Sequence, residues 1–302
     1  LMVALATALA ACGEEEQTTT TAAPDTTATT AGPATTAGPA TTAAPTTTEA
    51  EVLEPVELKF AYHTPEKASM VGAYFVPWAE SVTAATDGKV TITHYAGGSL
   101  VKEEQQLDGV LSGTSDIALL EPEFNAGVFK RTEVGSLPGL FPNTEVASNV
   151  FWDILQEYCM EELSDVQLLG VVVLSAGPYV GNKDVKVPAD MNGLRMRSGG
   201  KVETWLIEAA GGTPVEINLG ERPTQFERGA VDGTFISWSI MLSQGLKDVT
   251  KYRTEADLFY RAWLLVMNKD KWESLPEAYK QAFMDSSGKE NSTKYNVANE
   301  KA

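Results

Sequence analysis

One stretch of the chain, residues 191–238, limits strongly the folds that the sequence can adopt. It reads strand, helix, strand, helix, strand, and the strands are predicted at Leu194–Arg197, Thr213–Ile217 and Gly233–Ser237. Short strands that alternate with helices indicate a mainly parallel, doubly wound sheet. Ligands of such sheets bind beyond the carboxyl ends of the strands. Because Arg197 and Trp238 both stand at strand ends, the stretch predicts half of a ligand cleft.

Helical spacing is clear between the first two of these strands. Ser198-Gly-Gly opens a predicted helix, and Gly211-Gly212 ends it. The apolar positions at helical spacing, expected to face the core, are Val202, Trp205, Leu206 and Ala209. A second helix is expected to cross through Phe226.

The same pattern occurs nearer the N-terminus. The predicted strands are Glu57–Tyr62, Lys89–Tyr95 and Asp116–Leu120, with helices between them. Tyr62 and His63 stand at the end of the first strand, and Glu121 follows the third. A near-continuous apolar run at 166–174 predicts a strand that is buried on both faces.

Composition sets broad limits on partners. The chain has 302 residues and a formal net charge of −18. Such acidity argues against nucleic acid, and against an anionic membrane surface, as electrostatic partners. The part rich in apolar residues is long enough for one large domain or a two-lobed one.

The first 55 residues differ from the rest. Residues 1–11 form an apolar run that is too short to span a bilayer, and the segment around Cys12 resembles the bacterial lipobox. We therefore expect a signal-peptide remnant at 1–12, with a lipid on Cys12. Residues 13–55 are mostly Thr, Ala, Pro and Glu, so they predict a disordered tether, either bare or glycosylated.

The motifs of the folded part resemble one family. Gly193-Leu-Arg-Met-Arg197, Gly211-Gly-Thr-Pro and Gly229-Ala-Val-Asp-Gly233 are similar to segments of the DctP-like solute-binding subunits of tripartite ATP-independent periplasmic (TRAP) transporters, and the likeness extends over about 56–300. Since relatives continue for further helices, we expect missing residues at both ends. The resemblance implies a two-lobed α/β periplasmic-binding-protein fold (type II-like) with a cleft between lobes: lobe I at 56–175 and about 258–302, lobe II at 176–257.

The resemblance also implies a role for Arg197, because the last Arg of the family's strand motif holds the substrate's carboxylate in a bidentate salt bridge. A guanidinium presents paired donors that match a carboxylate. The alternative is a structural ion pair with one of the 41 acidic residues. Arg195 lies two residues earlier, on the same strand face by alternation, and is a lesser candidate.

Other candidate ligand contacts stand at strand ends. Glu121 could accept from a hydroxyl or amine of the ligand, or it is a solvated loop acid. His63 and Tyr62 occupy the end of the first strand, where a lone His is more often packed than ligating. Trp238 and Phe235 are expected either to form an apolar wall or to pack in the core.

Two positions depart from the family pattern. Where many members carry a second Arg, this chain has Gly177, and a common Asn is replaced by Ile236. The second arginine contact is therefore expected to be missing. A sialic-acid or C4-dicarboxylate specificity does not carry over to this chain.

Enzyme chemistry has little support in the sequence. Only His63 and His94 are present, and Cys159 lies on an apolar helix, where an inert thiol is expected. HExxH, Walker and GxSxG motifs and Cys/His clusters are all missing. We therefore predict a protein that is not an enzyme and needs no cofactor or metal.

These observations lead to one main hypothesis. The chain is predicted to be the extracytoplasmic, lipid-anchored binding component of a TRAP transporter, monomeric, which captures a small organic acid and delivers it to the membrane permease. One alternative is the binding protein of an ATP-driven (ABC) importer. The other is a sensor or adhesion lipoprotein that does not transport.

Overall fold

The computed structural model describes residues 53–125, 127–175, 177–255 and 258–302. The predicted signal remnant, Cys12 and the tether up to residue 52 lie outside the described residues. Within the described part, none of the helices is both long and apolar enough to span a membrane.

Five strands form the first sheet, in the order β2-β1-β3-β10-β4. Their bounds are β1 Val56–Ala61, β2 Val90–Tyr95, β3 Ile117–Leu120, β4 Val166–Ser175 and β10 Tyr260–Asn268. β2, β1 and β3 pair in parallel, and β10 is antiparallel to both β3 and β4. Four strands therefore point the same way, and only β10 runs against them.

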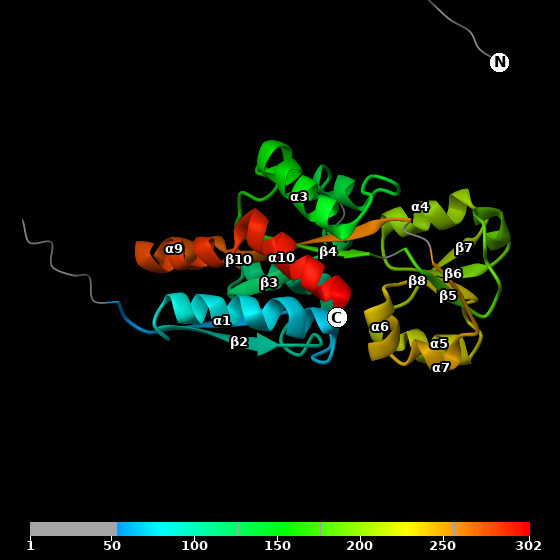
Figure 1. Cartoon of the computed structure of the whole chain (residues 1–302), viewed down its shortest axis with the longest axis horizontal. Coiled ribbons are helices and arrows are strands. Elements are labelled where there is room, and N and C mark those ends of the chain that lie inside the picture. Colours follow the sequence, from blue (N-terminus) through cyan, green and yellow to red (C-terminus); the bar gives the residue numbers. More distant parts are fainter. Residues whose placement is uncertain (1–52, 126, 176, 256–257) are drawn as a thin grey trace, which may run out of the picture. The chain divides into compact units, whose positions relative to one another are not determined.

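Helices cover both faces of this sheet. They are η1 Val71–Phe75, α1 Val76–Ala85, η2 Glu103–Gln105, α2 Gln106–Leu111, η3 Pro122–Phe124, η4 Thr132–Ser136, α3 Thr144–Ile154, η5 Leu155–Cys159, α8 Lys269–Ser274, α9 Glu277–Ser286 and α10 Gly288–Lys301. Trp78 of α1 and Phe283 of α9 pack on one face, and Phe151 of α3 packs on the other. Figure 1 shows α1 and α3 on opposite sides of the strands. The first sheet and the helices packed on it are called lobe I below.

The second sheet repeats this pattern with shorter strands, in the order β7-β6-β8-β5-β9. The strands are β5 Tyr179–Gly181, β6 Arg195–Ser198, β7 Thr213–Glu216, β8 Gly233–Phe235 and β9 Tyr252–Thr254. β7, β6 and β8 are parallel, and β5 is antiparallel to β8 and to β9. Again a single strand, β5, opposes the other four.

Shorter helices surround the second sheet. They are η6 Pro188–Met191, α4 Lys201–Ala209, η7 Leu219–Glu221, α5 Arg222–Glu227, α6 Trp238–Ser243 and α7 Leu246–Val249. Ile207 of α4 packs on one face, and Phe226 of α5 with Met241 of α6 packs on the other. The second sheet with these helices is called lobe II.

The expected core face of α4 is wrong in part. Trp205 is 50% exposed, whereas Ile207 is fully buried. The helix begins at Lys201, after an extended Gly200, and this phase directs Val202, Glu203 and Ile207 inward. The apolar residues at helical spacing therefore did not all lie on the buried face of the helix.

The predicted fold class is confirmed, because each lobe is a mainly parallel sheet flanked by helices. The chain passes from the first sheet to the second between β4 and β5, and returns between β9 and β10. The predicted lobe limits adjoin positions 176 and 256–257, which lie outside the described residues. Those limits stay a prediction.

Candidate functional site

A narrow cavity lies among residues of both lobes. Its charged lining consists of His63, Glu103, Glu121, Arg197, Arg222 and Arg261. Phe124, Phe235 and Trp263 are among its apolar walls. The space open to the centre of a water molecule is about 20 Å³, close to what a single water needs. An organic acid can therefore enter only if the lobes separate or the lining rearranges.

Strand ends place three of the predicted residues at this cavity. Glu121 directly follows β3, His63 comes two residues after the neighbouring parallel strand β1, and Arg197 lies near the end of β6. The carboxyl ends of parallel strands share one edge of a sheet, which is where ligands of α/β proteins bind. The structure thus brings His63, Glu121 and Arg197 together in one cavity.

Arg197 is buried but incompletely paired. Its side chain is 3% exposed, and its Nε donates to the carbonyl of Ile217 at 3.0 Å. Its Nη1 lies 3.5 Å from Oε2 of Glu203 and has no hydrogen-bond partner within the described residues. Burial lowers the pKa of Arg197, and the Glu203 carboxylate partly offsets this effect. The guanidinium can still bind an anion through its unpaired arm.

Gly199 explains how the guanidinium reaches this position. A Cβ atom on Gly199 would lie 2.1 Å from Nη1 of Arg197 and 2.6 Å from its Cζ. Any other residue at this position would collide with the guanidinium or displace it. The glycine expected only to open a helix also makes room for the candidate clamp.

Arg195 does not share the environment of Arg197. Its side chain is 48% exposed, and its Nε lies 3.2 Å from Oδ2 of Asp232. Both arginines belong to β6, but Arg195 pairs with Asp232 at the surface, whereas Arg197 is buried. Arg195 is a paired surface residue and serves as a natural comparison for Arg197.

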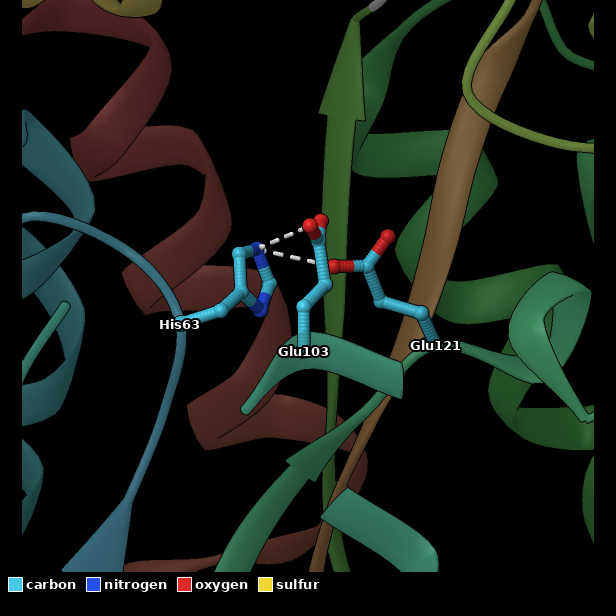
Figure 2. A group of neighbouring side chains, drawn as sticks. All are labelled: His63, Glu103 and Glu121. Atoms are coloured by element: carbon cyan, nitrogen blue, oxygen red, sulfur yellow. Dashed lines mark ion pairs between the residues drawn. The ribbon is translucent and has the colours of Figure 1, made fainter. Parts of the chain in front are cut away.

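One nitrogen of His63 faces two carboxylates. Figure 2 shows Glu103 and Glu121 both turned toward its imidazole, with Nε2 lying 2.8 Å from Oε1 of Glu121 and 3.8 Å from Oε1 of Glu103. Burial lowers the pKa of His63, but the two carboxylates outweigh this, so the pKa is raised above its ordinary value. Burial, and then the charge of Glu121, raise the pKa of Glu103.

These three side chains have the donor types of a metal site. Their candidate ligand atoms lie within 4.8 Å of one another. However, His63 and Glu121 are already in direct contact with each other. The three arginines of the same cavity also repel a cation, so we do not assign a metal here.

Sequence reasoning missed Arg261, which bridges the two lobes. From β10 it places Nη1 2.9 Å from Oε1 of Glu123 in lobe I, and Nη2 2.6 Å from Oε2 of Glu203 in lobe II. Burial opposes its charge, but these carboxylates raise the pKa of Arg261 overall. Burial raises the pKa of Glu123 to about 7. A single Arg within an apolar strand was the signal, because a buried charge needs partners.

Arg222 and Glu103 were also missed. Arg222 begins α5, and Glu103 begins the short η2 turn. Both occur in polar segments, where such residues usually face solvent, so no local signal marked them. Although Gly177 leaves out the family's second arginine, the cavity has further arginines from other elements.

Of the remaining predicted contact residues, one lines the cavity and two lie elsewhere. Phe235, at the end of β8, lines the cavity. Tyr62 instead packs within lobe I against Phe60 and Phe75, 1% exposed, and burial raises its pKa to about 12. Trp238 lines a neighbouring cleft of about 480 Å³, together with Pro178. Tyr62 and Trp238 are thus not part of the lining of the charged cavity.

Comparisons with known proteins agree with this architecture. The computed structure superposes with a TM-score of 0.77 on a TRAP solute-binding protein from Rhodoferax ferrireducens bound to benzoate, at 26% identity over 81% of this chain and 78% of that one. It superposes with a TM-score of 0.75 on a TRAP periplasmic protein from Bordetella bronchiseptica bound to mandelate, at 25% identity over 81% and 79%. The fold and site define a two-lobed binding protein.

The family itself follows from the sequence match. Residues 60–302 match the model of the DctP family, the bacterial extracellular solute-binding proteins of family 7, and the chain belongs to this family. A curated relative is the outer membrane transporter protein TsaT of Comamonas testosteroni, 28% identical over 223 residues. That match covers 70% of this chain and 64% of the relative. The predicted resemblance to TRAP solute-binding proteins is confirmed.

Proposed function

We propose that this protein captures a small organic carboxylate between its two lobes and delivers it to the membrane subunits of a TRAP transporter. The observation that carries the proposal is Arg197, a buried guanidinium near the end of a strand, whose Nη1 has no hydrogen-bond partner within the described residues and only a 3.5 Å ion pair with Glu203. A buried charge with incomplete hydrogen bonds is costly, whereas a bidentate carboxylate supplies both a counter-charge and two hydrogen bonds. The family membership supports the same function.

The two lobes have separate tasks in the proposed cycle. In the open state, water reaches the cavity and a carboxylate pairs with Arg197 of lobe II. Closure brings His63 and Glu121 of lobe I against the ligand and expels water, which strengthens the ion pair. Contacts from both lobes stabilise the closed state, and the permease selects that state. The work is capture and release without a covalent step, so the protein is proposed not to be an enzyme.

The proposal includes the location of the protein. Its family is extracellular, and a lipid on Cys12 would hold it, as a monomer, at the outer face of the cytoplasmic membrane. Membership in the DctP family favours a TRAP permease over an ATP-driven importer as its partner. Mass spectrometry of the protein from the membrane fraction tests the anchor, which requires a diacylglyceryl thioether on Cys12.

Isothermal titration with benzoate and mandelate tests the binding function, since proteins of similar fold hold these acids. We expect saturable binding that Arg197→Gln weakens by about 100-fold or more, because the variant loses the charge and the fork-shaped pair of donors. The matched control is Arg195→Gln on the same strand, which removes a surface arginine and is expected to change the affinity less than about threefold. Equal losses in the two variants contradict the assignment of Arg197.

A further inference from the structure

The charges of the cavity are divided between two walls. Lobe II contributes Arg197 and Arg222, and lobe I contributes Glu103, Glu121, His63 and the already paired Arg261. A ligand between the lobes touches both walls. Its chemistry can therefore be inferred from what each wall lacks.

The guanidinium groups on the wall of lobe II lack full partners. Arg222 is 3% exposed, lines the cavity, and forms no hydrogen bond or ion pair within the described residues; its buried Nε has no partner. Burial, and then the charges of Arg197 and Arg261, lower its pKa well below the ordinary value. Arg261, by contrast, has two carboxylates within 2.9 Å. Two incompletely paired guanidinium groups thus face one cavity, and a carboxylate satisfies both.

The wall of lobe I lacks proton donors. Glu121 is 4% exposed, and Glu103 and Glu121 both approach Nε2 of His63, which carries at most one proton (Figure 2). Arg261 of the same lobe directs its two Nη groups to Glu123 and Glu203, and within the described residues no side chain other than His63 is in hydrogen-bonding contact with the carboxylate of Glu103 or Glu121. Ionised carboxylates only accept hydrogen bonds. A buried acceptor without a donor costs free energy, so this wall favours an N–H or O–H group of the ligand.

The charge count bears on an ammonium group. Three guanidinium groups of the site face four carboxylates, those of Glu103, Glu121, Glu123 and Glu203. With His63 and all four carboxylates charged, the set is neutral. A ligand carboxylate then adds one negative charge, which an ammonium group on the same ligand balances.

We propose that the ligand is an organic acid that also carries a hydrogen-bond-donating hydroxyl or ammonium group, with its carboxylate bound by Arg197 and Arg222 and its donor group bound by Glu121 and Glu103. This inference rests on the proposed function, because it assumes that a carboxylate binds here. It adds the second group that the ligand must carry, and a second arginine that holds the carboxylate.

Matched acids test this on the native protein. The first series is phenylacetate, mandelate and phenylglycine, which differ only by a hydroxyl or an ammonium beside the carboxylate. The second is benzoate, 3-hydroxybenzoate and 3-(aminomethyl)benzoate, which place the same groups across the ring. Titration calorimetry on the full chain is expected to show at least about tenfold tighter binding of a donor-bearing acid than of its parent, in at least one series.

The outcomes separate the two proposals. If the parent acids bind as well as every donor-bearing acid, the inference fails and the proposed function stands. Tighter binding of isophthalate, whose second group is an anion, also overturns the inference. If none of these acids binds, the proposed function fails first and the inference fails with it. The comparison between hydroxyl and ammonium identifies which donor the site prefers.

Two variants test which wall of the cavity binds each group of the ligand. Arg222→Gln is expected to weaken binding of every acid by about tenfold or more, whereas Arg228→Gln, an exposed arginine at the end of the same helix, serves as the control. Glu121→Gln is expected to reduce the ratio of affinities between the ammonium acid and its parent at least fivefold. If Arg222→Gln binds like the control, or if that ratio is unchanged in Glu121→Gln, the corresponding wall has been misassigned.

Discussion

Lobe I and lobe II share one strand pattern but differ in how much core they bury. The long strands β4 and β10 of lobe I have 10 and 9 residues, while β5 and β9 of lobe II have 3 each. Lobe I buries Trp78 and Phe283 in clusters far larger than those of lobe II. Yet lobe II carries Arg197 and Arg222, the buried guanidinium groups that lack full partners.

This difference indicates that lobe I mainly contributes the apolar core, whereas lobe II mainly contributes the arginines that bind the ligand. Lobe I has the larger apolar core, and its own buried Arg261 is fully paired, by Glu123 of lobe I and Glu203 of lobe II. Lobe II leaves its guanidinium groups incompletely paired, at a cost that a bound carboxylate offsets. Ligand binding should therefore stabilise lobe II more than lobe I, because a ligand stabilises the state that binds it.

The largest expected effect comes from truncating a buried phenylalanine in the core of each lobe. Phe283→Ala in lobe I is expected to lower the free energy of unfolding by about 3–5 kcal/mol, the usual range for a buried phenylalanine. Phe226→Ala in lobe II should cost less, because a small cluster under short strands collapses more easily around the gap. Urea unfolding measures both variants. A larger cost for Phe226→Ala reverses the assignment of lobe I as the stable lobe.

The next effect concerns the position of Arg197 in lobe II. Gly199→Ala places a methyl group where the guanidinium lies, and it should weaken binding of the carboxylate by about 100-fold, or roughly 2.7 kcal/mol. Gly72→Ala in lobe I is the control, because a Cβ there meets nothing within 4 Å. Titration calorimetry compares the two variants. Normal binding by Gly199→Ala shows that the guanidinium does not need its present position.

A smaller effect is expected where the lobes are joined. Glu203→Gln weakens the contact with Arg261 and removes the nearest charge to Arg197, so it should cost about 2 kcal/mol of stability. Lys201→Ala removes the 3.8 Å pair with Glu133 and the contact of Lys201 Nζ with the Trp205 ring, and it should cost about 1 kcal/mol or less. Thermal unfolding at neutral pH ranks the two. Equal costs mean that the buried pair contributes no more than a surface one.

The smallest effect is a pH dependence. Glu123 has a pKa raised from 4.5 to about 7, so the folded protein binds its proton more tightly than the unfolded chain does. Its contribution to stability is present below pH 4.5 and is lost as the pH rises through 7. The glutamine of Glu123→Gln does not ionise. The melting temperature of this variant minus that of the native protein should therefore increase by a few degrees from pH 5 to pH 8. Glu80→Gln, on the surface of α1, is the control. A falling difference for Glu123→Gln means that the charged carboxylate is stabilising.

The sequence allowed the fold and part of the site to be predicted, for one physical reason. Strand ends in parallel sheets are fixed by local periodicity, so His63, Glu121 and Arg197 could be placed from the pattern alone. For Phe235 the pattern left an apolar wall and core packing open, and the residue both lines the cavity and belongs to a buried cluster of lobe II. The family motif added the expected role of Arg197.

The rest depended on tertiary packing. Arg222 and Glu103 begin short helical turns, and only the closing of the two lobes directs them into one cavity. Trp205 had apolar spacing but the wrong helix phase, and Arg195 was drawn outward by Asp232, which is 37 residues further along the chain. Periodicity describes a single element and cannot give the partner that a side chain meets across the fold.

The position of β10 has a consequence for how the chain is made. This strand lies between β3 and β4, yet it is the last strand in the sequence. All of lobe II is therefore synthesised while the facing edges of β3 and β4 still lack their shared neighbour. Unpaired strand edges invite association with other chains, and pairings between distant segments form slowly. We therefore expect the sheet of lobe I to be completed after the strands of lobe II have been synthesised, despite the larger core of lobe I.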